Sequence, residues 1–123
     1  MVVENLLVAS GAVIATVMIH FLGLVGLGGL VKRRIRKTSV PTTVVRQSGV
    51  VLLIVLSLFA LHTVEIWLYA GLYIALGEFG TLESALYFST TTFTTVGFGD
   101  LYLDEKWRLV AAIQSANGFL LIG

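Results

Sequence analysis

The residues with the clearest chemical potential lie between Thr92 and Asp100, a stretch that reads TFTTVGFGD. Gly97 and Gly99 are separated by one bulky residue, and glycine adopts positive φ at little steric cost. Positive φ at alternate residues would turn successive backbone carbonyls toward one side. A row of carbonyl oxygens can replace the hydration shell of a cation. The spacing therefore indicates a cation-binding segment, with the Thr95 hydroxyl as a further oxygen at its inner end.

This stretch resembles the selectivity filter of potassium channels, T-x-x-T-V-G-Y/F-G-D. The resemblance extends upstream over residues 85–89 (ALYFS) and downstream over residues 107–111 (WRLVA) and Gly118. It implies a homotetramer, since one chain supplies one filter strand and the family uses four. The resemblance implies that residues 95–99 form the filter. The implied K⁺ ligands are Thr95, Val96, Gly97 and Phe98.

The sequence departs from the commonest family pattern around the filter. Phe98 stands where tyrosine is usual, so its ring can pack behind the filter without a hydroxyl bond. Tyr87 and Phe88 stand where tryptophans are often found, which predicts a lighter aromatic support. Thr91 stands where some members have a glutamate that pairs with the filter's aspartate, here Asp100. That carboxyl pair is therefore expected to be absent.

Composition favours a membrane protein. Hydrophobic residues make up 57% of the 123 residues, charged residues make up 12%, and cysteine is absent. We predict an all-α, potassium-channel-like membrane protein with three transmembrane helices, a re-entrant pore helix and an extended selectivity filter. Residues 1–47 would form an N-terminal transmembrane helix (about 6–31) and a basic cytoplasmic loop. Residues 48–123 would form the pore domain, with an outer helix at 48–76, a pore helix at 82–93 and an inner helix at 107–123.

The predicted inner helix is short. Seventeen residues make about 25 Å of helix, less than the hydrocarbon thickness of a bilayer. The chain is therefore expected to be truncated within this helix. Gly118 lies where the family often has a hinge glycine. Gln114 and Asn117 either bond between helices or face the cavity, and the sequence leaves both possibilities open.

Charge placement predicts the topology. A basic cluster follows the first span, and such clusters mark cytoplasmic loops that attract anionic lipid headgroups. It consists of Lys32, Arg33, Arg34, Arg36 and Lys37. Acidic residues dominate the segments assigned to the other side, where Trp67, Tyr69 and Tyr73 are expected at the interface. We therefore expect an integral protein of a plasma or inner membrane, with its N-terminus and the Asp100 end of the filter outside and its C-terminus cytoplasmic.

Two ionisable residues lie within the second span. His62 and Glu65 are three residues apart, on one helix face, and ionisable groups inside a span are costly and often functional. His20 of the first span lies at a similar depth. Three interpretations stay open. Glu65 could be a structural brace that accepts bonds from Thr90 and Thr91 of the pore helix, with His62 as the alternative partner. The residues could also form a proton sensor or a metal site.

Other functional classes find little support in the sequence. No span carries regularly spaced arginines, so a voltage sensor is not expected. No nucleophile and base pair or phosphate-binding loop indicates an enzyme, and the basic cluster is too short and too close to the bilayer to indicate nucleic-acid binding. No cofactor is expected beyond the permeant K⁺. The predicted function is a potassium-selective channel subunit; the alternatives are a less selective cation channel and a non-conducting accessory membrane protein with a pore-like fold.

Overall fold

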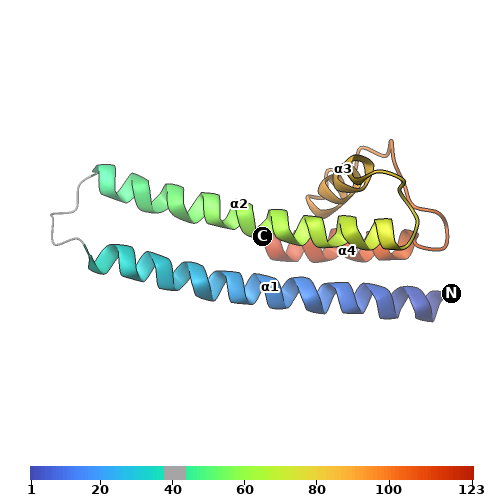
Figure 1. The fold of residues 1–123 in the computed structure, drawn as a ribbon, viewed down its shortest axis with the longest axis horizontal. Helices are drawn as coiled ribbons and strands as arrows, with labels where there is room; N and C mark the ends of the chain where they lie inside the picture. The colour runs from blue at the N-terminus through green and yellow to red at the C-terminus, as the bar shows by residue number, and fades with distance from the viewer. Residues whose placement is uncertain (38–43) are drawn as a thin grey trace.

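The computed structural model describes residues 1–37 and 44–123, which form four helices and no strand. Helices α1 (Val2–Arg36) and α2 (Val44–Ala75) run antiparallel and side by side (Figure 1). Helices α3 (Leu82–Phe93) and α4 (Arg108–Ile122) pack against the half of this pair that is nearest the N-terminus. The all-helical class expected from the sequence is therefore confirmed.

Helices α1 and α2 are each long and apolar enough to cross a membrane. At 1.5 Å per residue both reach about 50 Å, well beyond a hydrocarbon core of about 30 Å. Helix α4 is apolar but shorter, with 15 residues.

The basic cluster is helical, which corrects the loop expected there. Arg33, Arg34 and Arg36 form the last turn of α1, and Lys37 caps it by donating its backbone N–H to the Arg33 carbonyl at 3.1 Å. Cations near a helix C-terminus are favourable because they face the negative end of the helix dipole. The loop that was expected to run to residue 47 also ends earlier, since α2 begins at Val44; Pro41 lies outside the described residues.

The core lies where α3 and α4 join the long pair. The buried positions of α1 are Asn5, Ala9, Ala12 and Thr16, whose spacing of three and four residues puts them on one face. Those of α2 fall in its last three turns. Further along the pair, the Leu61 side chain fills the space that a Cβ of Gly23 would need, so α1 and α2 also approach closely there.

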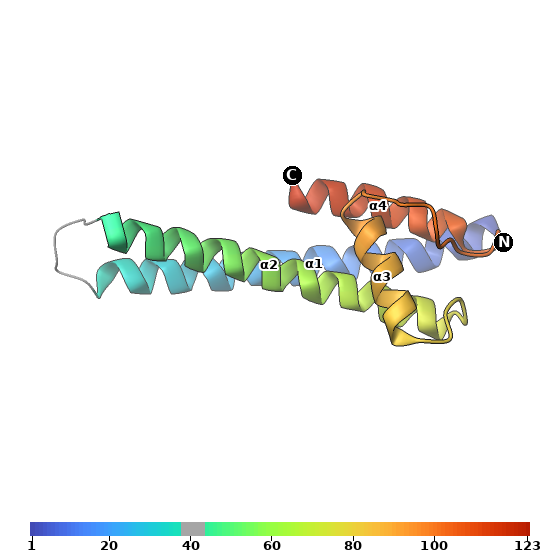
Figure 2. The same ribbon diagram turned by 90° about the horizontal axis from the view of Figure 1, so that it is seen from above.

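Helix α3 begins with a side-chain cap and packs across α2 (Figure 2). The Thr81 hydroxyl accepts the Ser84 backbone N–H at 3.2 Å, as at many helix starts. The ring of Phe88 meets the rings of Tyr73 and Phe79 at centroid distances of 5.3 and 5.2 Å. Ser89 then donates its hydroxyl to the Ile66 carbonyl at 2.8 Å, which fixes the height of α3 on α2.

Two buried amides of α4 bond to the other three helices. Gln114 donates to the Ser89 hydroxyl of α3 at 2.8 Å and accepts the Tyr73 hydroxyl of α2. Asn117 donates to Thr16 of α1 at 2.8 Å and to the Tyr69 hydroxyl at 3.0 Å. Gln114 and Asn117 therefore bond between helices, which is one of the two possibilities that the sequence left open.

These bonds also correct the position expected for two tyrosines. Tyr69 and Tyr73 are fully buried, because their hydroxyls are the partners of the α4 amides, so they are not interfacial anchors. Trp67, on the opposite side of α2, remains 54% exposed.

Candidate functional site

The candidate filter starts at the C-terminal end of α3. The backbone N–H of Thr95 donates to the Thr92 carbonyl at 3.1 Å, and that of Gly97 donates to the Thr91 carbonyl at 2.9 Å. Ser115 of α4 adds a hydroxyl bond to the Thr92 carbonyl at 3.0 Å. The chain thus folds back against the last turn of α3, and carbonyls that a helix end leaves without partners are satisfied.

The backbone of the candidate filter, residues 95–99, alternates in handedness. Thr95, Gly97 and Gly99 have φ of 62°, 53° and 75°, whereas Val96 and Phe98, between them, have no positive φ. The two glycines follow the expectation from the sequence. Thr95 was not predicted to do so, because positive φ is a rare and strained conformation for a β-branched residue. The strained positive φ of Thr95 extends the alternation in the sign of φ over all five residues, 95–99.

Helix α3 also supplies a favourable field. Its C-terminal residue, Phe93, directly precedes the segment that leads into the filter. The C-terminal end of a helix carries the negative end of the backbone dipole, which favours a nearby cation. A cation at the inner end of residues 95–99 would therefore be stabilised by α3 as well as by the filter oxygens.

Tyr87 contacts the Asp100 end of the candidate filter. Its hydroxyl donates to the Asp100 carboxylate at 2.8 Å, and its ring stacks on that of Phe98 with centroids 6.5 Å apart. This bond raises the pKa of Tyr87 above its ordinary value. Sequence reasoning did not predict the Tyr87–Asp100 pair, although a phenol in the short helix before the filter was the available signal.

Two other expected support residues face elsewhere. The Thr91 hydroxyl donates to the Phe88 carbonyl of its own helix at 3.1 Å and does not reach Asp100. Phe88 is buried among Tyr73 and Phe79 on the α2 side of α3. Phe88 therefore anchors α3 to α2, and of the two candidate aromatic residues it is Tyr87 that touches the filter.

Gly118 lies at a tight helix contact. A Cβ built at this position would come within 1.9 Å of the Phe93 carbonyl oxygen, so α4 crosses the end of α3 at a distance that only glycine allows. The residue singled out as a hinge candidate is thus part of the packing that holds the filter's inner end, within a continuous helix.

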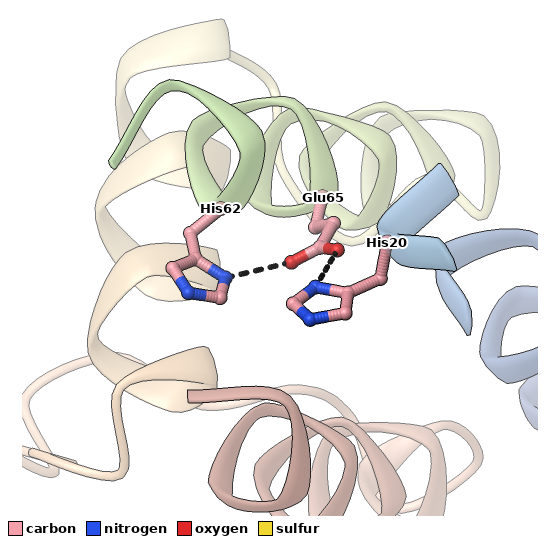
Figure 3. Close-up of side chains that lie close together, drawn as sticks. All are labelled: His20, His62 and Glu65. Carbon is pink, nitrogen blue, oxygen red and sulfur yellow. Dashed lines mark hydrogen bonds and ion pairs between the residues drawn. The ribbon is translucent and has the colours of Figure 1, made fainter. Parts of the chain in front are cut away.

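The three intramembrane ionisable residues are brought together by α1 and α2 (Figure 3). Nδ1 of His20 lies 2.9 Å from one oxygen of Glu65, and Nδ1 of His62 lies 2.9 Å from the other. The predicted bonds from Thr90 and Thr91 to Glu65 are wrong, since both threonines donate to carbonyls of α3. Local back-bonding within a helix competes with any bond to a neighbouring helix.

Comparison with known proteins identifies the family. Residues 49–123 match a family model described as an ion channel, and these residues include most of α2 together with α3, the filter segment and α4. No curated protein and no solved structure matches the chain. The matched domain is the two-transmembrane, pore-loop type found in potassium channels. The protein is thus a membrane protein and belongs to the ion channel family.

Proposed function

We propose that this chain is a subunit of a potassium-selective channel that assembles as a homotetramer. The observation that carries the proposal is the alternating handedness at residues 95–99. Reversing every second peptide lets the carbonyls of Thr95, Val96, Gly97 and Phe98 point toward one axis. Carbonyl rings of this kind replace the water around K⁺.

The surfaces around the filter support assembly with further copies. One strand provides oxygens on one side of an ion only, so a complete coordination shell requires several strands. Val96 and Phe98 are apolar, yet they are 56% and 70% exposed in the single chain. Neighbouring copies around a fourfold axis would cover these side chains and close the ring of carbonyls.

The proposed topology places α1, α2 and α4 across the membrane, with α3 re-entrant. Asn5 donates to the Lys106 carbonyl, and Glu4 lies 3.6 Å from the Lys106 ammonium group. The N-terminus therefore lies beside the segment that follows the filter, as Figure 1 shows. The basic end of α1 lies at the opposite end of the molecule, which is the cytoplasmic end by the positive-inside rule.

Anionic lipids are the proposed partners of that basic end. A pocket of about 510 Å³ lies between α1 and α2 there, with an apolar lining that includes Leu24, Leu27 and Ile54. Lys32 and Arg36 also line it. An acyl chain would fit the apolar part while the headgroup meets the basic cluster.

Reversal potentials of the reconstituted protein test the proposed function. In a potassium gradient opposed by sodium, the current should reverse close to the potassium equilibrium potential. Gly97→Ala should abolish this selectivity, because a Cβ disfavours positive φ in the filter. Gly77→Ala is the matched control, since Gly77 also has positive φ (78°) but lies in the turn after α2.

The alternatives give different results in the same assay. Reversal midway between the two equilibrium potentials would indicate a less selective cation channel. Absence of current together with absence of potassium flux from liposomes would indicate a non-conducting protein with a pore-like fold. Selective currents in Gly97→Ala at the wild-type level would contradict the filter assignment.

A further inference from the structure

The cluster of His20, His62 and Glu65 has the composition of a metal site. Glu65 is fully buried, and each of its two oxygens faces an imidazole Nδ1 at 2.9 Å. The two imidazole rings are stacked with their centroids 5.5 Å apart. Figure 3 shows both imidazoles turned toward the carboxylate. His20 comes from α1, whereas His62 and Glu65 come from α2. A residue from each helix is therefore required to complete it.

No lysine or arginine lies near this carboxylate in the sequence. Neither Lys nor Arg occurs between residues 5 and 31, between 47 and 105, or after Arg108. Glu65 lies ten residues before the end of α2, about 15 Å along the helix axis. A buried carboxylate at such a depth is costly unless a cation or several hydrogen bonds compensate it.

Two imidazole nitrogens and a carboxylate oxygen are a donor set that Zn²⁺ uses, with a fourth position left for water. One ligand atom from each residue can be chosen so that all three lie within 4.8 Å of one another. Tetrahedral Zn²⁺ places neighbouring ligand atoms about 3.4 Å apart, so small side-chain rotations would close the site. The imidazoles are 14% and 19% exposed, which leaves them reachable from outside the cluster.

We propose that His20, His62 and Glu65 bind a divalent transition-metal ion of the Zn²⁺ class between α1 and α2. Coordination through Nδ1 keeps each imidazole neutral, because its remaining proton resides on Nε2. The ion places positive charge directly beside the buried carboxylate. It also links two helices whose ligands are 45 residues apart in the chain.

The site adjoins the inner end of the filter. The ring of His62 lies 6.0 Å from that of Phe93, the last residue of α3. Both side chains also line a pocket of about 540 Å³ that includes Thr90 and Thr94. Metal binding would therefore fix the position of α1 and α2 behind the base of the filter; this consequence rests on the proposed channel function, whereas metal binding itself does not.

Direct metal binding by the full-length protein tests the proposal. The protein would be purified without a histidine tag, stripped with chelator and titrated with Zn²⁺ and with Co²⁺. His20 and His62 are its only histidines, so the tetrahedral Co²⁺ absorption reports on this site. We expect one Zn²⁺ per chain, a tetrahedral Co²⁺ spectrum, and a thermal midpoint raised by about 5 °C over the chelated protein.

Ligand variants separate a metal site from a hydrogen-bonded brace. His20→Gln and Glu65→Gln should each lower Zn²⁺ affinity at least about 100-fold, lose the Co²⁺ spectrum and lose the stabilisation by Zn²⁺. Glu83→Gln, at the far end of α3, should behave as wild type in all three measurements. His20→Gln changes a single side chain at the edge of the cluster, so it serves as the test if Glu65→Gln fails to fold.

Two outcomes would contradict the metal site, and neither depends on ion conduction. Wild-type protein that binds no Zn²⁺ or Co²⁺ at 100-fold molar excess would show the cluster to be a metal-free brace. Binding that persists in His20→Gln and in His62→Gln at wild-type affinity would place the metal elsewhere. A channel that conducts potassium but fails these tests would contradict the metal site alone.

Discussion

Gly118 and Gly71 are both helical glycines, but a side chain would meet very different surroundings at the two positions. A Cβ at Gly118 would come within 1.9 Å of the Phe93 carbonyl oxygen, whereas a Cβ at Gly71 would meet no atom of the described residues within 4 Å. The first glycine permits α4 to cross the end of α3, and the second has no such role. Residue type alone does not distinguish them.

Gly118→Ala should destabilise the folded protein. Separating α4 from α3 to accommodate the methyl group would disturb the Ser115 bond to Thr92 and cost about 3 kcal/mol. Gly71→Ala should be neutral or slightly stabilising, because alanine favours a helix by about 1 kcal/mol over glycine. Thermal unfolding of both detergent-solubilised variants measures this difference, and equal midpoints would contradict the close contact at Gly118.

Among the helices, α3 is the one that positions the candidate filter, residues 95–99. Its first residue is fixed by the Thr81 cap, its middle by Phe88 and Ser89 against α2, and its end by Ser115. The filter then bonds to its last turn through Thr95 and Gly97. The geometry of residues 95–99 therefore depends on contacts made throughout this short helix.

Tyr87→Phe should weaken the attachment of the filter's outer end to α3. The ring would still stack on Phe98, but Asp100 would lose its hydroxyl donor, so potassium currents should decay faster during sustained conduction. Tyr102→Phe is the matched control, because Tyr102 is 81% exposed. Current decay in Tyr87→Phe that matches wild type would show that this bond does not support the filter.

The same bond predicts how the effect of Tyr87→Phe on current decay varies with pH. The bond to Asp100 raises the pKa of Tyr87 above its ordinary value of 10.0, so the hydroxyl keeps its proton at pH 7 and pH 9 and loses it only as the pH rises through this higher value. Wild type and Tyr87→Phe should therefore differ by the same amount at pH 7 and pH 9. A difference that disappears between these pH values would contradict the role of the hydroxyl.

Local sequence signals predicted some elements well. Helix α3 occupies residues 82–93, the range predicted for the short helix, because a capping threonine precedes it and the glycine-rich segment follows soon after it. Positive φ at Gly97 and Gly99 follows from glycine itself. Each of these features depends on residues that are close together in the chain.

Features that depend on contacts between distant helices were not predicted. Tyr69 and Tyr73 suited an interface by residue type, but α4 covers them with two amides more than 40 residues away. The partner of Glu65 on α1 is 45 residues away, whereas the threonines expected as partners satisfy their own helix. Hydropathy also could not show that α1 continues through its basic end, because it registers only that the apolar residues stop there. The helix can continue because its dipole favours positive charges near the C-terminus.

The proposed orientation of the whole chain in the membrane can be tested by labelling. An epitope at the N-terminus should be accessible in intact cells, and one inserted at Pro41 should become accessible only after permeabilisation. The contacts of Glu4 and Asn5 with Lys106 predict that a third epitope, placed after Asp104, is accessible together with the N-terminal one. The opposite pattern for the first two epitopes would contradict the orientation derived from the charges.

In the proposed channel, identical copies of this chain arrange residues 95–99 around a single file of potassium ions. Electron cryo-microscopy of the full-length protein in potassium, with a matched sample in which sodium replaces potassium, tests this arrangement most directly. The predicted result is a fourfold particle with axial ion densities between the carbonyls of Thr95, Val96, Gly97 and Phe98, altered in the sodium sample. A particle in which these residues lie away from the symmetry axis, or a fourfold particle whose axis carries no ion density in potassium, would contradict this arrangement.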